Sequence, residues 1–204
     1  MTSFSSTFFE SPPTAPEAEN SIPVLETERL VLRAPRIEDV PFIAELADTA
    51  VVAEMAAGLP HPERPAAPGV STFAIFVKQP HGAALAGVAS LACRAGVPAP
   101  ELGCWVGGPH QGRGIATEAS RAIIDYAFSD TDMPSLAGAA RVVNPAARRV
   151  LEKCGFQWTG VGLARVRALG ASVPVDRFQL DRRTWASIRA WGAGALPLRR
   201  AAMA

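Results

Sequence analysis

The stretch from residue 101 to residue 156 constrains this chain more than any other, because it holds two strand-to-helix transitions in close succession. Residues 101–106 read as a strand and lead through a turn with Gly112 and Gly114 into a helix whose apolar residues recur every four positions, at Ile115, Ala119, Ile123 and Ala127. The first turn of a helix has N–H groups without an intrahelical partner and the positive end of the helix dipole, so it attracts an anion. Since glycines leave the approach open, this order predicts a pocket for a phosphorylated cofactor.

Two other phosphate-binding loops do not fit the same residues. A Walker loop needs a lysine after its second glycine, and none follows either glycine here. The dinucleotide fingerprint needs glycine at position 117, which is Thr117. A bare G-x-G turn could also do no more than start a helix. The second block, N-P-A-A-R-R-V-L-E-K-C-G-F at 144–156, adds an asparagine-capped helix that Pro145 opens and Gly155 ends, and it favours the cofactor pocket.

Composition limits the class of protein. The 204 residues suit one domain with a sizeable core, and a formal net charge of +1 gives no basic field that would indicate nucleic acid. None of the 3 histidines lies at ligand spacing from a cysteine, so no zinc or other metal is expected. The 3 cysteines are an odd number without close pairs, which favours free thiols and a cytoplasmic location.

The ends of the chain differ from its middle. Residues 1–22 are rich in serine and proline, lack the features of a secretory segment, and are predicted to form a disordered tail. Residues 192–204 are predicted to be a second loose tail, which leaves one domain over residues 23–191. The longest uncharged apolar stretch, 82–93, is well short of the roughly 20 residues that span a bilayer, so no membrane helix is expected.

The hydrophobic patterns predict an α+β fold, with one mixed, mostly antiparallel sheet of about six to seven strands flanked by helices. Strands are expected at residues 29–33, 72–77, 85–92, 101–106, 136–143, 158–166 and 173–180. Helices are expected at 37–48, 51–57, from 115 onward, from 145 to about 154 and around Trp185, and the proline-rich stretch 58–69 is expected to be a loop.

Gln111-x-x-Gly114-x-Ala116 matches the Q/R-x-x-G-x-G/A signature of the GNAT N-acetyltransferase superfamily. The opening T-E-R-L-V-L-R-A-P-R-I-E-D-V at 27–40 and the block 144–156 resemble the branch that contains the bacterial ribosomal-protein N-terminal acetyltransferases, and the resemblance runs from about residue 26 to residue 185. It implies a single GNAT-type domain in which the backbone amides of the signature loop hold the pyrophosphate of acetyl-CoA. The motifs are specific for the superfamily and its cofactor, and not for the amine acceptor.

The resemblance also implies a set of cofactor-binding residues. In such proteins the strand before the loop splays from its neighbour, the pantetheine arm lies in the gap, and the asparagine matching Asn144 bonds that arm. Asn144 is at the same time a favourable N-cap. Either Arg148 or Arg149 is expected to pair with the pyrophosphate. The predicted contacts are Cys104, Trp105, Val106, Gln111, Gly112, Arg113, Gly114, Ile115, Ala116, Thr117, Asn144 and Arg149.

Acyl transfer to an amine requires that the thioester be held, its carbonyl polarised and the amine presented without its proton. Backbone amides around Cys104 to Val106 can polarise the carbonyl. With reference pKa values of about 8 for an α-amine and about 10.4 for lysine, deprotonation at pH 7 costs roughly 1.4 or 4.6 kcal/mol. Glu101, at the start of the strand, is the candidate general base, where related enzymes often keep a carboxylate; it is equally well explained as an exposed strand-end residue.

The sequence departs from the superfamily in several places. Many members carry a tyrosine acid near the end of the second helix, but the stretch 150–156 has none, and Tyr126 on the first helix is expected in the core. Ala147 stands where the closest relatives often have serine. Transfer through an acetyl-cysteine at Cys104 or Cys154 is an alternative, but Cys154 ends a helix, which raises its pKa, so direct transfer is favoured.

The leading hypothesis is an acetyl-CoA-dependent N-acetyltransferase that moves the acetyl group directly to a primary amine, with protein N-termini or small amines favoured over lysine. A non-catalytic acyl-CoA-binding or sensing domain is the alternative from another class, and detoxification of small molecules is a third reading. The partners expected are therefore acetyl-CoA and an amine, without nucleic acid or membrane. Homodimers are common in the superfamily, although no residue of this chain demands one.

Overall fold

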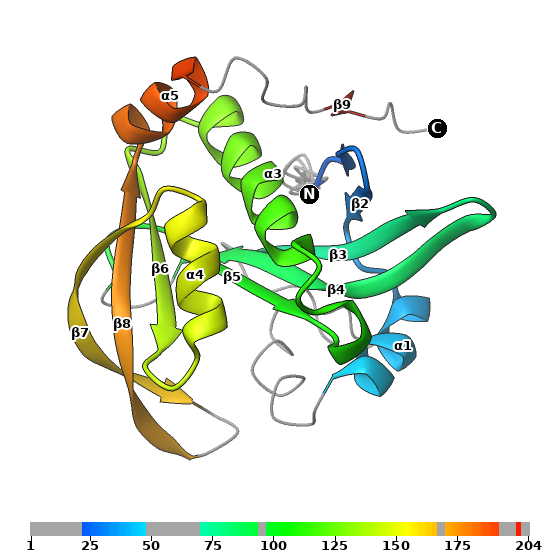
Figure 1. Cartoon of the computed structure of the whole chain (residues 1–204), viewed down its shortest axis with the longest axis horizontal. Helices are drawn as coiled ribbons and strands as arrows, with labels where there is room; N and C mark the ends of the chain where they lie inside the picture. Colours follow the sequence, from blue (N-terminus) through cyan, green and yellow to red (C-terminus); the bar gives the residue numbers. More distant parts are fainter. Residues whose placement is uncertain (1–21, 48–69, 94–96, 167–169, 192–198, 201–204) are drawn as a thin grey trace, which may run out of the picture.

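The frame of the protein is one mixed β-sheet, which in the described part of the chain has nine strands in the order β7-β8-β6-β5-β4-β3-β2-β1-β9 (Figure 1). The computed structural model describes residues 22–47, 70–93, 97–166 and 170–191, together with the backbone of 199–200. The strands are β1 (Leu25–Glu26), β2 (Leu30–Arg33), β3 (Val70–Gln79), β4 (Gly82–Ala92), β5 (Glu101–Val106), β6 (Ser135–Arg141), β7 (Gln157–Val166), β8 (Ala171–Asp181) and β9 (Arg199–Arg200). Among these strands only β5 and β6 are parallel neighbours.

The predicted α+β fold with a mixed, mostly antiparallel sheet is confirmed. Seven of the described strands have four residues or more, in agreement with the expected six to seven, and β1 and β9 add two residues each. β9 lies in the stretch 192–204 that the sequence predicts to be a loose tail, and it pairs with β1. The predicted helix at 51–57 and loop at 58–69 lie outside the described residues.

The helices lie on both faces of the sheet. They are α1 (Val40–Leu46), α3 (Ile115–Asp130), α4 (Pro145–Lys153) and α5 (Arg182–Trp191), with short 3-10 turns η1 (Ile37–Asp39) and η3 (Gly108–His110). Helices α3 and α4 lie side by side across β5 and β6 (Figure 1). Alternation along β4 separates the two faces, because Ala89 packs in the cluster under α3, whereas Val88 packs against Ile43 of α1.

The main core lies between α3 and the sheet. The residues predicted to form the apolar side of this helix, Ile115, Ala119, Ile123 and Ala127, are all buried. Phe73 of β3 and Phe128 of α3 are among the largest fully buried side chains. Tyr126 packs against this core and meets Phe73 edge to face at 5.8 Å between ring centroids, as predicted for a core residue.

One strand is shorter than predicted. The apolar run at 136–143 predicts a strand through Val143, but β6 ends at Arg141. The chain turns at Val142 and Val143, where the Asn144 N–H donates to the Arg141 carbonyl at 2.7 Å, and both valines are exposed. The early turn places Asn144 in position to cap α4.

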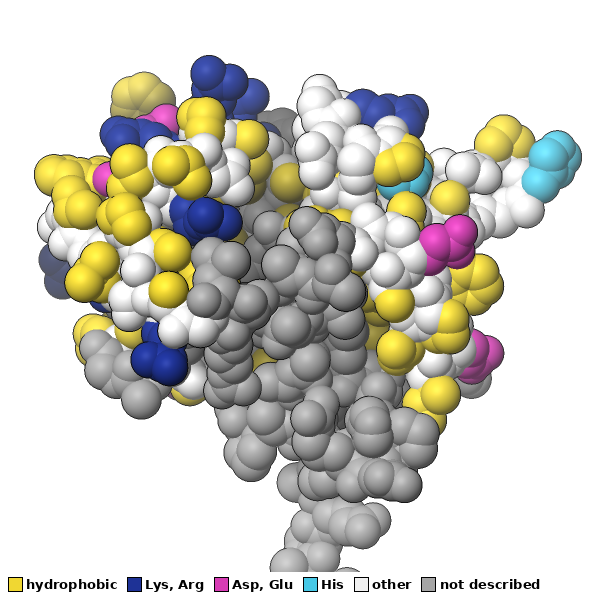
Figure 2. Space-filling model, turned by 90° about the horizontal axis from the view of Figure 1, so that it is seen from below, with side chains coloured by type: hydrophobic (Ala, Val, Ile, Leu, Met, Phe, Trp, Pro, Cys, Tyr) yellow, Lys and Arg dark blue, Asp and Glu magenta, His cyan; other side chains and the backbone are white. Residues whose placement is uncertain are grey.

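The sheet ends on one side at β7, whose outer residues are apolar. Val161 and Leu163 of this edge strand are exposed, as is Trp158 at its start. Figure 2 shows hydrophobic side chains gathered on the side of the molecule where β7 lies. No described helix is long and apolar enough to cross a membrane.

Candidate functional site

A cavity of about 550 Å³ lies where β5 and β6 separate, beneath the beginnings of α3 and α4. The two strands pair only at Glu101 with Ala137 and at Leu102 with Gly138. Beyond these pairs β5 continues along β4 and β6 continues along β8, so the strands diverge. The gap that the resemblance implies is therefore present, and its walls are the second half of β5, the following turn and α4.

The turn between β5 and α3 lines this cavity and carries backbone N–H groups without a backbone acceptor in the described residues. Gly112 and Gly114 have φ angles of +72° and +79°, in the left-handed region that glycine adopts without strain. The first α3 amide with a helical acceptor is that of Glu118, which donates to the Gly114 carbonyl at 3.0 Å. In the described residues the amides of 112–117 have no backbone acceptor, so a run of donors remains for an anion.

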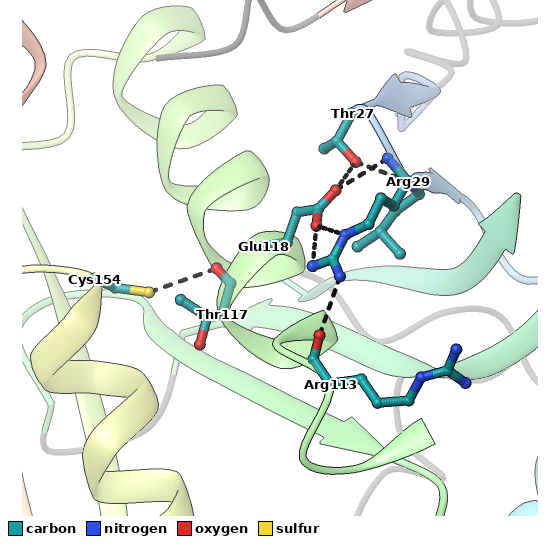
Figure 3. Close-up of polar contacts among 7 residues, drawn as sticks. Thr27, Arg29, Arg113, Thr117, Glu118 and Cys154 are labelled. Carbon is teal, nitrogen blue, oxygen red and sulfur yellow. Dashed lines mark hydrogen bonds and ion pairs between the residues drawn. The ribbon is translucent and has the colours of Figure 1, made fainter. Parts of the chain in front are cut away.

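Most of the predicted cofactor-binding residues line this cavity. They are Cys104, Trp105, Val106, Gln111, Gly112, Gly114, Ile115, Ala116, Thr117, Asn144 and Arg149. Arg113 does not line it. The Arg113 side chain extends away from α3, and its carbonyl accepts a hydrogen bond from Arg29 (Figure 3). Eleven of the twelve predicted residues therefore lie in the cavity wall, and the prediction is wrong for Arg113, whose carbonyl is bonded to Arg29 instead.

Gln111 fixes the start of the loop. Its Nε2 donates to the Val106 carbonyl at 2.9 Å, and its backbone N–H donates to the Gly108 carbonyl at 3.2 Å. The signature glutamine thus ties the loop back to the end of β5. This bond holds the first glycine of the loop at the rim of the cavity.

The two arginines of α4 have different surroundings. Arg148 donates to Glu152 at 2.9 Å and to Asp176 at 3.3 Å, on the side of α4 toward β8. Arg149 lines the cavity. Of the two alternatives left open by the sequence, the structure brings Arg149 to the pocket.

Asn144 caps α4 as predicted. Its Oδ1 accepts from the Ala147 N–H at 3.1 Å, and Pro145 occupies the first helical position. The cap uses only the side-chain oxygen, so the amide NH2 group can still donate to a ligand in the cavity that Asn144 lines.

Glu101 lies outside the cavity wall. It starts β5, where both neighbouring strands are paired with it, opposite Ala92 of β4 and Ala137 of β6. Leu102 packs in the main core on the face of the sheet that α3 covers. Because side chains alternate along a strand, the side chain of Glu101 lies on the opposite face. A role as general base therefore requires an acceptor that approaches from the opposite face of the sheet.

The thiols of Cys104 and Cys154 stay protonated near neutral pH. Burial raises the pKa of the Cys104 thiol to about 12 and that of Cys154 to about 11. The expected rise for Cys154 is confirmed, although burial is its largest cause and Arg121 opposes it. Cys154 contacts the Thr117 carbonyl at 3.7 Å (Figure 3).

Three polar residues of the cavity wall were not anticipated from sequence: His110, Ser120 and Lys153. The Nδ1 of His110 is buried and has no hydrogen-bond partner in the described residues, and the buried Oγ of Ser120 has only the Cys104 thiol beside it. A buried polar atom with no partner, or with only a weak one such as a thiol, is costly, so both residues are suited to a polar ligand. Ser120 follows Ala116 by one helical turn, and this spacing could have identified it.

The described residues contain no group of three or more histidine, cysteine, aspartate or glutamate side chains that could hold a metal ion.

Known proteins share this sequence pattern. The sequence model described as an acetyltransferase (GNAT) domain matches residues 29–157, more than half of the chain. YjcK of Bacillus subtilis (strain 168), named as a probable N-acetyltransferase, is 35% identical over 69 residues, which are 34% of this chain and 38% of YjcK. YdaF of the same strain, named as a candidate ribosomal N-acetyltransferase, is 32% identical over 85 residues, which are 42% of this chain and 46% of YdaF. The chain thus matches less than half the length of either relative.

Solved structures share the fold. A crystal structure described as a probable acetyltransferase superimposes with a TM-score of 0.65 at 22% identity, over 79% of this chain and 98% of the other. The spermidine N-acetyltransferase from Vibrio cholerae, in complex with CoA and spermine, superimposes with a TM-score of 0.60 at 20% identity, over 78% of this chain and 99% of the other. The fold agrees with the sequence match over residues 29–157, and the chain belongs to the GNAT acetyltransferase family.

Proposed function

We propose that this protein is an acetyl-CoA-dependent N-acetyltransferase that transfers the acetyl group directly to a primary amine. The observation that carries the proposal is the run of amides at 112–117 beside the gap between β5 and β6. A helix start supplies donors for a diphosphate, and a split between two strands accepts an extended amide-containing arm. Family membership supports the same ligand.

The residues of the cavity fit such a ligand. The amides of 112–117 would hold the pyrophosphate, with Arg149 as a charge partner. The NH2 group of Asn144 and the hydroxyl of Ser120 would satisfy polar groups of the pantetheine arm. When bound, acetyl-CoA supplies an activated acyl group; the backbone of β5 at Cys104 to Val106 polarises the carbonyl and orients it toward the amine.

Direct transfer is supported by the state of the thiols. An attacking cysteine must be a thiolate, and pKa values of about 12 for Cys104 and about 11 for Cys154 leave both thiols protonated near neutral pH. The amine itself is therefore the nucleophile in our proposal. The same free thiols support a reducing, cytoplasmic setting.

The acceptor class that we propose is a low-pKa amine, either a protein N-terminus or a small amine. Such an amine needs less help from a base, which suits a site whose described walls carry no carboxylate. YdaF is named for ribosomal N-acetylation, and the Vibrio cholerae enzyme is a spermidine N-acetyltransferase. These names define the acceptors to be tested first.

The test combines calorimetry with an acceptor panel. Titration with CoA and acetyl-CoA is expected to give saturable binding, and mass spectrometry is expected to detect acetylation of an N-terminal peptide or of a polyamine. Acetylation confined to lysine side chains would refute the preference for low-pKa amines. The absence of any binding heat would refute the whole proposal.

A non-catalytic acyl-CoA-binding domain is the second candidate, and one observation favours it. The α4 position at which many family members keep a tyrosine acid falls in the stretch 150–156, which has no tyrosine, and Tyr126 is partly buried against the core on α3. This candidate requires CoA binding together with no turnover on any acceptor. The calorimetric and mass-spectrometric results therefore separate the two functions.

Glu101 stays a predicted general base. In Glu101→Gln, kcat is expected to fall by about tenfold or more, and the rise of kcat/KM with pH should shift, because a carboxylate that removes the proton is lost. Rate profiles from pH 6 to 10 would measure this. Glu38→Gln, an exposed carboxylate on η1, is the matched control and should keep the wild-type profile. An unchanged profile in Glu101→Gln would remove it from the mechanism.

A further inference from the structure

Residues 27–29 contact the first turn of α3, although the two segments are far apart in the sequence (Figure 3). This segment belongs to no wall of the cavity, although it contacts the loop that forms one. We propose that Arg29 and Glu118 form a positioning pair that holds the glycine loop in its anion-binding conformation. The inference rests on the proposed function, because it assigns a role in acetyl-CoA binding to residues that do not touch the ligand site.

The contact between the two side chains is double. Arg29 donates through Nε to Glu118 Oε2 at 2.7 Å, and its Nη2 lies 2.5 Å from the same oxygen. The backbone N–H of Arg29 donates to Oε1 at 3.2 Å. Both oxygens of the carboxylate are therefore engaged by one residue of the segment before β2, which fixes the direction of the guanidinium.

The same guanidinium reaches the loop. Its Nη1 donates to the Arg113 carbonyl at 3.1 Å (Figure 3). A Cβ added at Gly114 would lie 3.4 Å from Nη2, so Arg29 packs directly on this glycine. The bond fixes the peptide group between Arg113 and Gly114, in the loop whose residues 112 and 114–117 line the cavity. Glu118 thus acts on the loop through Arg29.

Glu118 is itself held in place from the other side. Thr27 Oγ1 donates to Oε1 at 2.5 Å, and the Leu30 N–H donates to the same hydroxyl at 2.9 Å. Lys78 Nζ donates to the Thr27 carbonyl at 2.8 Å, which anchors this turn to β3. Burial alone would raise the pKa of Glu118, but the bonds from Thr27 and Arg29 outweigh it and lower the pKa below its usual value. The carboxylate is ionised at neutral pH.

A positioning role for Glu118 and a simple effect of its negative charge predict opposite changes in CoA affinity. Glu118 is a negative charge in the first turn of the helix that would receive a diphosphate. By Coulomb's law, removal of this charge should strengthen anion binding. If Glu118 positions the loop through Arg29, its removal should weaken binding, because the loop loses its preorganised conformation.

The decisive variant is therefore Glu118→Gln, which keeps the size of the side chain and removes its charge. The Kd for CoA, measured by calorimetry, is expected to rise about tenfold over wild type. With an acceptor in hand, KM for acetyl-CoA should rise while kcat is kept. A Kd equal to or below that of wild type would overturn the proposal.

A second measurement needs neither ligand nor turnover. In Arg29→Ala, hydrogen exchange of the Glu118 amide, which donates to the Gly114 carbonyl, should be faster by about tenfold in the ligand-free protein, because the bond from Arg29 to the Arg113 carbonyl is lost. Arg33→Ala is the matched control. Arg33 of β2 makes a bidentate pair with Asp39 on the α1 side, and this variant removes that pair. Exchange at Glu118 that rises equally in both variants would show general loosening and would overturn the positioning role.

The outcomes for this inference and for the proposed function are distinct. Wild-type protein that does not bind CoA would refute the proposed function and the inference with it. Wild-type protein that binds CoA, together with Glu118→Gln protein that binds it equally well, would refute the positioning pair alone. Circular dichroism of each variant checks that the fold is kept.

Discussion

Gly114 is the residue whose backbone shape the anion site depends on most. It is the N-cap of α3, with φ at +79°, and it lines the cavity together with the first three residues of the helix. Any side chain in this conformation is strained by roughly 1–2 kcal/mol. A substitution here therefore acts on the loop even before a ligand is considered.

We expect Gly114→Ala to lose about 1 kcal/mol of unfolding free energy and to bind CoA more weakly, because the loop leaves its left-handed turn to relieve the strain. Urea unfolding and calorimetry measure the two effects. Gly108→Ala serves as the control, since Gly108 does not have a positive φ and an added Cβ would meet nothing within 4 Å. Equal losses in both variants would contradict the role of the turn.

The thiol of Cys104 makes stability depend on pH in the alkaline range. Its pKa in the folded protein, about 12, is above the ordinary value of 9.0, so the folded state favours the protonated thiol. The resulting stability is fully present below pH 9 and is lost as the pH rises toward 12.

The difference in unfolding free energy between wild type and Cys104→Ala should therefore be constant up to about pH 9, and wild type should lose stability relative to the variant above it. Urea midpoints at pH 7.5, 9 and about 10.5 would show this. A difference that does not vary with pH would mean that the thiol is less buried than described. Retained acetyl transfer in the variant would also agree with direct attack.

Some residues of the site were predictable and others were not. The glycines and Asn144 follow from local rules, because a positive φ and a helix cap each demand particular residue types. The choice between Arg148 and Arg149 depends on Asp176, which lies on β8 and pairs with Arg148. A partner so distant in sequence leaves no local pattern, so this choice needed the structure.

At the scale of elements, α4 rests on β6 at a glycine. A Cβ added at Gly138 would lie 2.8 Å from Leu151 Cδ2 and 3.5 Å from Phe156 Cε1. Gly138 therefore lets the Leu151 side chain of α4 pack directly on β6, and the same helix carries Asn144 at its start and Arg149 in the cavity wall.

Gly138→Ala is expected to destabilise the protein by about 1–3 kcal/mol, because it overpacks this contact, and to weaken CoA binding, because α4 moves relative to the cavity. Thermal unfolding and calorimetry would measure both. The double variant Gly138→Ala with Leu151→Val makes room at the contact and should recover part of each loss. A double variant no better than the sum of the single ones would contradict the close approach.

The bounds of the strands and helices show which structural features local sequence patterns can predict. Strand β5 has the predicted bounds because Pro100 and Gly107 limit it on both sides. The β3–β4 hairpin is longer than expected. It continues through Lys78 with Ala83 and Gln79 with Gly82, where polar residues opposite small ones give no apolar alternation. Helix α5 extends over ten residues because Trp185 docks it to Asp125 through a 2.7 Å bond, a tertiary contact.

For the whole molecule, ligand binding should raise the free energy of unfolding. At a concentration one hundred times Kd, acetyl-CoA is expected to add roughly 2.7 kcal/mol to the free energy of unfolding, if it binds only the folded state. For a chain of this size the midpoint of thermal unfolding should then rise by roughly 5 to 10 °C. Scanning fluorimetry over a range of acetyl-CoA concentrations would test this, with ATP as the comparison nucleotide. A similar rise with ATP would mean that the site does not recognise the pantetheine arm.

The sheet also has a division that follows from the short pairing of β5 with β6. One part contains β6, β7 and β8, the other contains β1 to β5 and β9, and two residue pairs are the direct strand contacts between the parts in the described chain. A molecule bound along the open edge would replace the missing contacts and link the parts on both sides of the opening. A ligand in the gap should therefore make the two parts of the sheet move as one unit. Release of CoA should then depend on the two parts moving apart.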